Sequence, residues 1–346
     1  MDKIKISICM PTRNRANFIG TAIESIISQA DDSIEIVVVD GASCDNTQEV
    51  VFGYRKKFRN LVYCRQDENG GVDRDMAKAI ALARGEYCWL FSDDDALKPG
   101  SIERMLKEID SGYEIYLCNV TACNLDMKPI RDRFWLSAKV NDRVFNLHKK
   151  DELIEYCERA SSIGALFSFW SSVILSRREW NKAGYSHDFE GTAYASAAVL
   201  LSFIRHKCRL KYIKSPLVLW RNDNVSFQDD GGLVDRFLLD FNGYLRLADK
   251  YLSDDLKVKK VFLKVMTREH PWYTIIHAAS FIGSPELWRE FSAKLLKFGY
   301  SRRMAQACYS LGRPKKLVTI AVNLKRKIVK SPRVHKIKKV FLKRSI

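Results

Sequence analysis

Apolar side chains follow two alternating spacings along the first 120 residues. Short runs rich in β-branched residues predict strands at 4–10, 35–39, 61–64 and 87–91. Between them, apolar residues recur every three or four positions and predict helices at 17–29, 45–58 and 75–83. The run 36–39 is apolar without interruption, which is typical of a central parallel strand. Strands and helices that alternate in this way predict a doubly wound α/β sheet.

The pattern changes beyond this region. A mixed α/β pattern extends from 130 to 251, and 256–300 has helical spacing. We therefore expect two halves of one α/β domain, 1–125 and 126–250, then a helical extension, 251–312, and a tail, 313–346. The longest uncharged stretch, 160–176, is rich in serine and favours a buried strand and helix over a membrane span. The nine scattered cysteines form no disulfide or zinc pattern, which indicates a reducing compartment.

Polar clusters follow three of the predicted strands, at 11–14, 40–43 and 93–95. The carboxyl ends of parallel strands meet at one edge of a sheet, where ligands of such folds bind. Three adjacent carboxylates repel one another, and a divalent cation such as Mg²⁺ or Mn²⁺, shared with substrate phosphates, would relieve that repulsion. A solvated turn with helix-capping acids is the alternative on these three residues alone.

Other side chains near these clusters suit a nucleotide. Arg13, Arg74 and Lys78 are candidates for phosphate contacts. Asp40 is a candidate hydrogen-bond acceptor for a base or ribose, or else a plain turn residue. The glycines at 70–71 permit a backbone to approach a ligand closely. The sequence lacks the usual signatures of a dinucleotide enzyme, a P-loop NTPase, a zincin and a serine hydrolase. Together these residues indicate a site for a nucleoside diphosphate and a metal.

Three segments, ISICMPTRNR, VVVDGASCDNT and YCWLFSDDDALKPG, resemble in order and spacing the N-terminal half of family-2 glycosyltransferases of the GT-A fold. The resemblance implies that Asp40 contacts the nucleobase. It also implies that the acidic run binds ribose and metal, with Ser92 in the place of the first acid. We expect Asp94 and Asp95 to bind Mg²⁺ or Mn²⁺. The residues expected to bind the donor are Pro11, Thr12, Arg13, Asp40, Asp73, Arg74, Asp93 and Arg221. For Arg221, a polar turn is an equal alternative.

A narrower resemblance covers most of 4–275. The segments NGGVDRDMAKAIALARGEYCWLFSDDDAL, SSIGALFSFWSSVI and REHPWY are similar to abequosyltransferases of bacterial O-antigen synthesis. Those enzymes transfer a 3,6-dideoxyhexose from a CDP-sugar to a lipid-linked oligosaccharide at the cytoplasmic face of the inner membrane. The resemblance implies a surface-polysaccharide glycosyltransferase with a polyprenyl-diphosphate-linked acceptor. The sugar and its nucleotide (CDP, UDP, GDP or dTDP) stay open.

The catalytic base is the least defined part of this prediction. An inverting transfer needs a carboxylate that deprotonates the acceptor hydroxyl. The nearest matches to the family's second acidic motif are Asp188 and Glu190, which precede a predicted helix. Helix capping is the alternative role for both acids. Inversion or retention therefore stays open.

Positive charge is concentrated at the C-terminal end of the chain. The net charge is +17, and the residues after Glu290 include 17 Lys and Arg but no Asp or Glu. In the tail, apolar positions between Leu317 and Ile328 share one helical face with bases around it, which is typical of a helix that lies on an anionic membrane. We therefore expect a cytoplasmic protein, peripheral on the inner membrane.

Two other classes of protein share some of these features. A nucleic-acid-binding protein would use the basic tail on phosphates, but Phe341 is the single aromatic residue in the last 37 residues, and stacking on bases needs more. A sugar nucleotidyltransferase would share the acidic site. It usually begins with a glycine-rich loop that bears Lys or Arg, and 11–14 is not such a loop.

Overall fold

The structure of the protein is a computed structural model that describes residues 3–222, 232–314 and 318. The chain divides into two compact units. The first comprises Met1–Val225 with Gly243–Val265, and the second comprises Ser226–Asn242 with Met266–Ile346. The predicted amphipathic helix of the tail lies outside the described residues.

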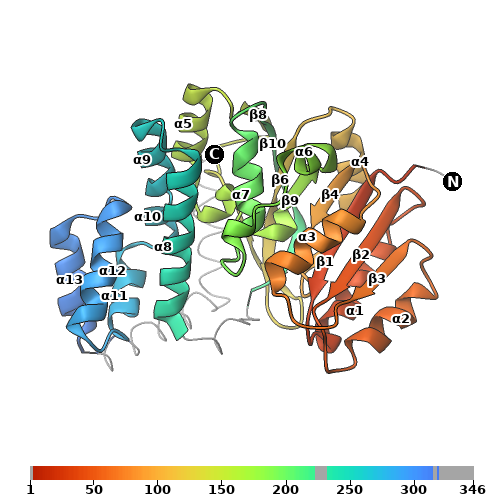
Figure 1. Cartoon of the computed structure of the whole chain (residues 1–346), viewed down its shortest axis with the longest axis horizontal. Helices are drawn as coiled ribbons and strands as arrows, with labels where there is room; N and C mark the ends of the chain where they lie inside the picture. The colour runs from red at the N-terminus through yellow and green to blue at the C-terminus, as the bar shows by residue number, and fades with distance from the viewer. Residues whose placement is uncertain (1–2, 223–231, 315–317, 319–346) are drawn as a thin grey trace, which may run out of the picture. The chain divides into compact units, whose positions relative to one another are not determined.

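The first unit is built on one sheet in the order β3-β2-β1-β4-β9-β6-β10-β5, with β7 beside β6 and β8 beside β10 (Figure 1). Its strands are β1 Ile6–Thr12, β2 Ile34–Asp40, β3 Leu61–Arg65, β4 Tyr87–Leu90, β5 Ala96–Leu97, β6 Ile115–Cys123, β7 Pro129–Arg133, β8 Arg143–Asn146, β9 Val173–Ser176 and β10 Arg209–Arg221. The first four strands are parallel, as are β6 and β10, while β9 runs antiparallel between β4 and β6. The predicted α/β sheet is confirmed.

Helices cover this sheet. They are α1 Ala16–Ile27, α2 Thr47–Arg55, α3 Val72–Leu82, α4 Ser101–Ile109, α5 Lys150–Arg159, α6 Arg177–Ala183, α7 Ala195–Phe203 and α9 Leu256–Lys264. Every residue of β1, β2 and β6 is buried, because both faces of these strands are packed. In Figure 1, α3 lies against β1 and β2. The polar clusters therefore follow directly on the carboxyl ends of strands that belong to the buried core.

Several boundaries differ from the predicted ones by a few residues, and two of these differences change the site. β1 continues to Thr12, because Thr12 still pairs with Asp40 of β2, so the first polar cluster begins inside the strand. α3 begins at Val72 instead of 75, after Gly71 with φ 88°. Asp73 and Asp75 then lie in its first turn, where negative charge interacts favourably with the helix dipole.

The second unit is helical. α8 Gly232–Tyr251 contributes its first half to this unit, which also contains α10 Met266–Glu269, α11 Trp272–Ala279, α12 Pro285–Lys297 and α13 Arg302–Gly312. Ser284 and Ser301 cap α12 and α13 by accepting hydrogen bonds from Leu287 N and Met304 N. Among the residues that the structure describes, no helix has the length and apolar character needed to cross a membrane.

Two helical glycines lead to opposite predictions for the same substitution. A Cβ at Gly243 of α8 would lie 2.3 Å from Cδ2 of the buried Tyr194, whereas a Cβ at Gly53 of α2 would meet nothing within 4 Å. We expect Gly243→Ala to lower the free energy of unfolding by about 1–3 kcal/mol, because the site would be overpacked. Gly53→Ala should raise it by about 0.5–1 kcal/mol through helix propensity. Urea denaturation of both variants measures this, and equal effects of the same sign would contradict the packing around Gly243.

Candidate active site

Asp95 holds the acidic loop, residues 92–95, that follows β4. Its side chain is 1% exposed; Oδ2 accepts a hydrogen bond from Ser171 Oγ at 2.6 Å, and Oδ1 accepts one from Arg221 N at 3.1 Å. Ser171 Oγ also accepts a hydrogen bond from Ser92 N at 3.0 Å. Burial, and then the charge of Asp94, raise the pKa of Asp95. Asp95 was expected to bind metal, but the structure turns both of its oxygens inward, to positions that fix the loop.

The other two acids of the loop lie nearer the surface of the sheet edge. Asp93 is 7% exposed, with Oδ1 3.8 Å from Arg15 Nε. Burial, and then the charge of Asp94, raise the pKa of Asp93 to about 7 against the opposing effects of Thr12 and Arg15. Asp94 is the most accessible of the three acids, and its Oδ1 accepts a hydrogen bond from Ser92 Oγ at 2.6 Å. The charge of Asp94 thus raises the pKa of both neighbouring acids, and a nearby cation would offset this repulsion.

The donor set suits a metal that is shared with a substrate. Within the described residues, no group of three or more His, Cys, Asp or Glu side chains converges on one point as a metal cage does. Asp94 therefore offers one accessible carboxylate, with Asp93 beside it. Mg²⁺ is commonly bound by one or two carboxylates together with waters and substrate phosphates. The residues present fit that kind of site.

Asp40 closes the turn after β2. It is fully buried, and its carboxylate accepts hydrogen bonds from Ser43 N at 2.8 Å and from Tyr63 OH at 2.6 Å. It was expected to contact a nucleobase, but this geometry engages both oxygens inside the protein. Pro11 and Thr12 end the neighbouring strand and are buried as well. Asp40, Pro11 and Thr12 are therefore buried parts of the sheet edge and expose little polar surface to a ligand.

Asp75 is a site acid that the sequence did not reveal. It is 4% exposed and faces Gly41, where an added Cβ would lie 2.5 Å from Asp75 Oδ2. Burial, and then the charge of Asp40, raise the pKa of Asp75 to about 6, against the lowering effect of Arg13. Asp75 and Asp40 thus form a second pair of neighbouring acids at this edge, besides Asp93 and Asp94.

Asp73 connects α3 to a distant segment. Its carboxylate is 2% exposed and accepts hydrogen bonds from Ala193 N at 2.9 Å and from Ala195 N at 3.4 Å. Burial raises its pKa, and these backbone hydrogen bonds oppose the rise. Asp73 was expected to bind the donor. The structure instead uses it to hold the start of α7 beside the amino end of α3.

The two candidate bases have different surroundings. Glu190 accepts a hydrogen bond from Arg74 Nε at 2.9 Å and lies 2.7 Å from His187 Nδ1, and Arg74 lowers its pKa. Asp188 has a side chain that is 68% exposed and pairs with Lys250 Nζ at 2.6 Å, which lowers its pKa. Arg74 lies in the first turn of α3, so Glu190 is joined to the carboxyl edge of the sheet, whereas Asp188 pairs with α8.

Arg221 is 5% exposed and supports the acidic loop. Its Nε donates to Asp94 O at 2.9 Å, and its guanidinium also donates to Leu125 O. Arg221 was expected to bind the donor, but its guanidinium donates these hydrogen bonds to backbone oxygens of the protein. Arg13 is exposed at the end of β1, beside Asp75, and stays available for a phosphate.

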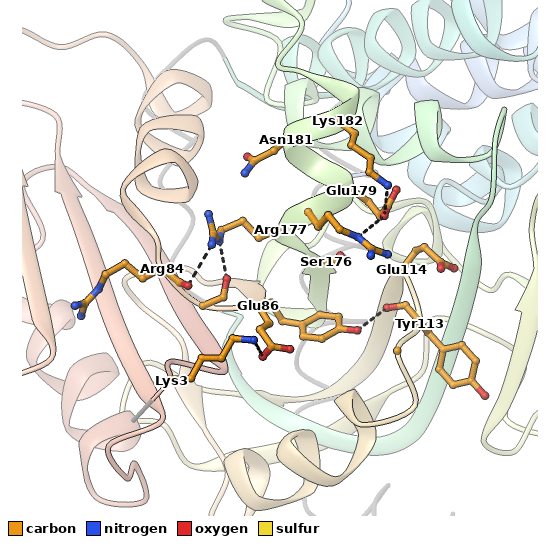
Figure 2. Close-up of a pocket in the computed structure, with 14 residues that line it drawn as sticks. Lys3, Arg84, Glu86, Tyr113, Glu114, Ser176, Arg177, Glu179, Asn181 and Lys182 are labelled. Carbon is orange, nitrogen blue, oxygen red and sulfur yellow. Dashed lines mark hydrogen bonds and ion pairs between the residues drawn. The ribbon is translucent and has the colours of Figure 1, made fainter. Parts of the chain in front are cut away.

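A cavity of about 830 Å³ lies at the opposite edge of the sheet, where β4 begins and β9 ends (Figure 2). Its charged groups have partners: Lys3 pairs with Glu86, and Glu179 pairs with Arg178 and Lys182. Arg177 donates hydrogen bonds to the backbone carbonyl oxygens of Arg84 and Gly85, which precede β4. None of the predicted site residues lines this cavity.

A comparison with known protein families gives the class of this protein. Residues 7–184 match the model of the family described as glycosyl transferase family 2, and the chain belongs to that family. It is therefore a glycosyltransferase. It is 33% identical to the abequosyltransferase RfbV of Salmonella typhimurium, over 94% of this chain and 99% of that protein.

Two further proteins are similar to this chain. The GalNAc(5)-diNAcBac-PP-undecaprenol beta-1,3-glucosyltransferase of Campylobacter jejuni is 27% identical over 74% of this chain and 76% of its own. TarS 1-349 of S. aureus, solved in complex with UDP-GlcNAc, shares the fold with a TM-score of 0.64 at 16% identity, covering 90% of this chain and 92% of its own.

The buried charge of Asp75 gives a prediction on pH dependence. Its folded-state pKa of about 6 lies above the ordinary value of 3.8, so its contribution to stability is fully present below the ordinary value and is lost as the pH rises through about 6. We expect Asp75→Asn to stabilise the protein on the order of 1 kcal/mol more at pH 8 than at pH 4, because the neutral amide escapes this loss. Chemical denaturation at both pH values measures it. The same difference between variant and wild type at pH 4 and pH 8 would contradict a buried, titrating Asp75.

Proposed function

We propose that this glycosyltransferase moves a sugar, a 3,6-dideoxyhexose such as abequose, from a nucleotide-sugar onto a lipid-linked oligosaccharide in O-antigen synthesis. The observation that carries the proposal is the similarity to an abequosyltransferase, which extends over 94% of the chain instead of one shared domain. The Campylobacter relative, whose name includes an undecaprenol-linked substrate, supports a polyprenyl-diphosphate carrier for the acceptor. CDP is the nucleotide that we expect.

The donor is proposed to bind at the carboxyl edge of β1, β2 and β4. Asp94 would hold Mg²⁺ or Mn²⁺ together with the donor diphosphate, and Asp93 would add negative charge beside it. Such a metal stabilises the charge that develops on a departing diphosphate. Arg13 is an exposed arginine at the same edge and would contact a phosphate oxygen. Pro11 and Thr12, at the end of β1, would form part of the surface on which the nucleotide packs.

Of the two acids expected to accept the proton of the acceptor hydroxyl, we retain Glu190. Its side chain is 19% exposed, and Arg74 ties it to the amino end of α3, which lies at the donor edge. The carboxylate is ionised, as a proton acceptor must be, while the hydrogen bond from Arg74 that lowers its pKa also makes it a weaker base. Asp188 is more exposed and is paired with Lys250, which makes it a suitable control.

The proposal is tested by assaying transfer and donor hydrolysis with CDP-, UDP-, GDP- and dTDP-sugars. We expect a CDP-3,6-dideoxyhexose to be the preferred donor. Asp94→Asn should lower the rate of transfer by about 100-fold or more, because the leaving diphosphate loses its charge stabilisation. Asp188→Asn should leave the rate within about threefold. Circular dichroism verifies that both variants fold. Full activity of Asp94→Asn, or of the wild type with chelator, would refute the metal assignment.

We also propose that the protein works on the cytoplasmic face of the inner membrane and that residues 313–346 bind its anionic surface. The support is the sequence pattern of bases around an apolar face, and each base near such a surface adds about 1 kcal/mol.

Removal of residues 315–346 should release the protein from anionic vesicles. The wild type should sediment with anionic vesicles at low salt, less at high salt, and not with neutral vesicles. Equal sedimentation of the truncated and full chains would rule out the tail as the membrane-binding element.

A further inference from the structure

Four side chains form a tight aromatic cluster at the ends of β7 and β10. The Arg133 guanidinium lies over two indole rings, 5.5 Å from the centroid of Trp135 and 5.4 Å from that of Trp220. The Phe169 ring contacts the same two indoles at centroid distances of 5.3 and 5.5 Å. Trp135 is 2% exposed, whereas Arg133, Phe169 and Trp220 each keep part of their surface accessible. The cluster therefore has a buried base and an accessible side.

The base of the cluster is rigid. Trp135 N donates to Asn119 Oδ1 at 2.9 Å, and Trp135 Nε1 donates to Cys118 O at 2.8 Å. Gly164 lies so close that an added Cβ would be 2.2 Å from the indole ring. Arg133 and Trp220 pair with Val120 and Ala122 of β6, two residues apart, and so share one face of the sheet. A ligand would meet aromatic rings that are already in place.

The cluster also adjoins the acidic loop. Phe169 stands two residues before Ser171, whose hydroxyl binds Asp95 and the backbone of Ser92. Trp220 precedes Arg221, whose backbone N–H binds Asp95 and whose Nε binds the Asp94 carbonyl oxygen. The two segments that carry the accessible rings are thus the segments that position Asp94. Along the chain, the accessible rings are therefore one and two residues from the groups that hold the acidic loop.

We propose that Trp220, Phe169 and Arg133 form the binding surface for the acceptor sugar. The proposal rests on the proposed function, because glycosyl transfer needs an acceptor hydroxyl beside the sugar–diphosphate bond. The apolar C–H face of a pyranose packs on aromatic rings, which offer large contact area with little loss of side-chain freedom. The Arg133 guanidinium stacks on both indoles and helps to hold the two rings in place. The ligand class is therefore a neutral hexose at the acceptor end of a lipid-linked oligosaccharide.

The test is steady-state kinetics of Trp220→Leu and Phe169→Leu with a lipid-linked oligosaccharide extract as acceptor and the preferred nucleotide-sugar as donor. We expect the KM for the acceptor to rise about 10-fold in each variant, with kcat at saturating acceptor and KM for the donor within about twofold of the wild type. Trp220→Phe retains a ring and should recover most of the acceptor affinity.

Phe281→Leu is the matched control, because Phe281 is an exposed aromatic residue, 43% accessible, in the second unit, whereas Trp220 and Phe169 belong to the first. All of its kinetic constants should equal those of the wild type.

An unchanged KM for the acceptor in Trp220→Leu and Phe169→Leu would overturn the proposal. So would a fall in donor affinity as large as the fall in acceptor affinity, since the rings would then only support the acidic loop. If Trp220→Leu fails to fold, Phe169→Leu and Trp220→Phe decide the question. Failure of the wild type to bind any nucleotide-sugar would instead refute the proposed function.

Discussion

Burying a carboxylate is unfavourable by several kcal/mol unless hydrogen bonds or opposite charges compensate for the lost water. This chain buries two of three successive acids, Asp93 and Asp95, in the loop that follows the buried strand β4. Ser171 and the Arg221 backbone satisfy Asp95, and Arg15 lies near Asp93. The segment before β9 and the end of β10 thus supply the hydrogen bonds that Asp95 needs.

The acids of the first unit divide into two groups with different roles. Asp95, Asp40 and Asp73 have oxygens that accept hydrogen bonds from within the protein, and each fixes a turn or loop at the carboxyl edge. Asp94 and Glu190 stay more accessible, and these are the acids to which we assign chemistry. Carboxylates that are held inward thus position those that face the substrate. The aromatic cluster around Trp135 is the surface that we propose for the acceptor.

The sequence predicted the α/β sheet and the family, because strand periodicity and short motifs are local features. It did not predict which carboxylates turn inward, because that depends on partners far along the chain. Ser171 lies 76 residues from Asp95, and Arg221 lies 126 residues from it. A lone serine after a run of aromatic residues gives no signal of such a contact. Asp75 was missed because α3 begins earlier than its apolar spacing indicates.

The central claim is that Asp94 and a divalent cation together bind the diphosphate of a nucleotide-sugar. Isothermal titration of CDP into the full-length protein, with Mn²⁺ present or with chelator, tests this claim most directly. The account predicts saturable binding with Mn²⁺ that weakens at least about 10-fold on chelation, since each tenfold corresponds to about 1.4 kcal/mol. Equal affinity for CDP with and without the metal would contradict it.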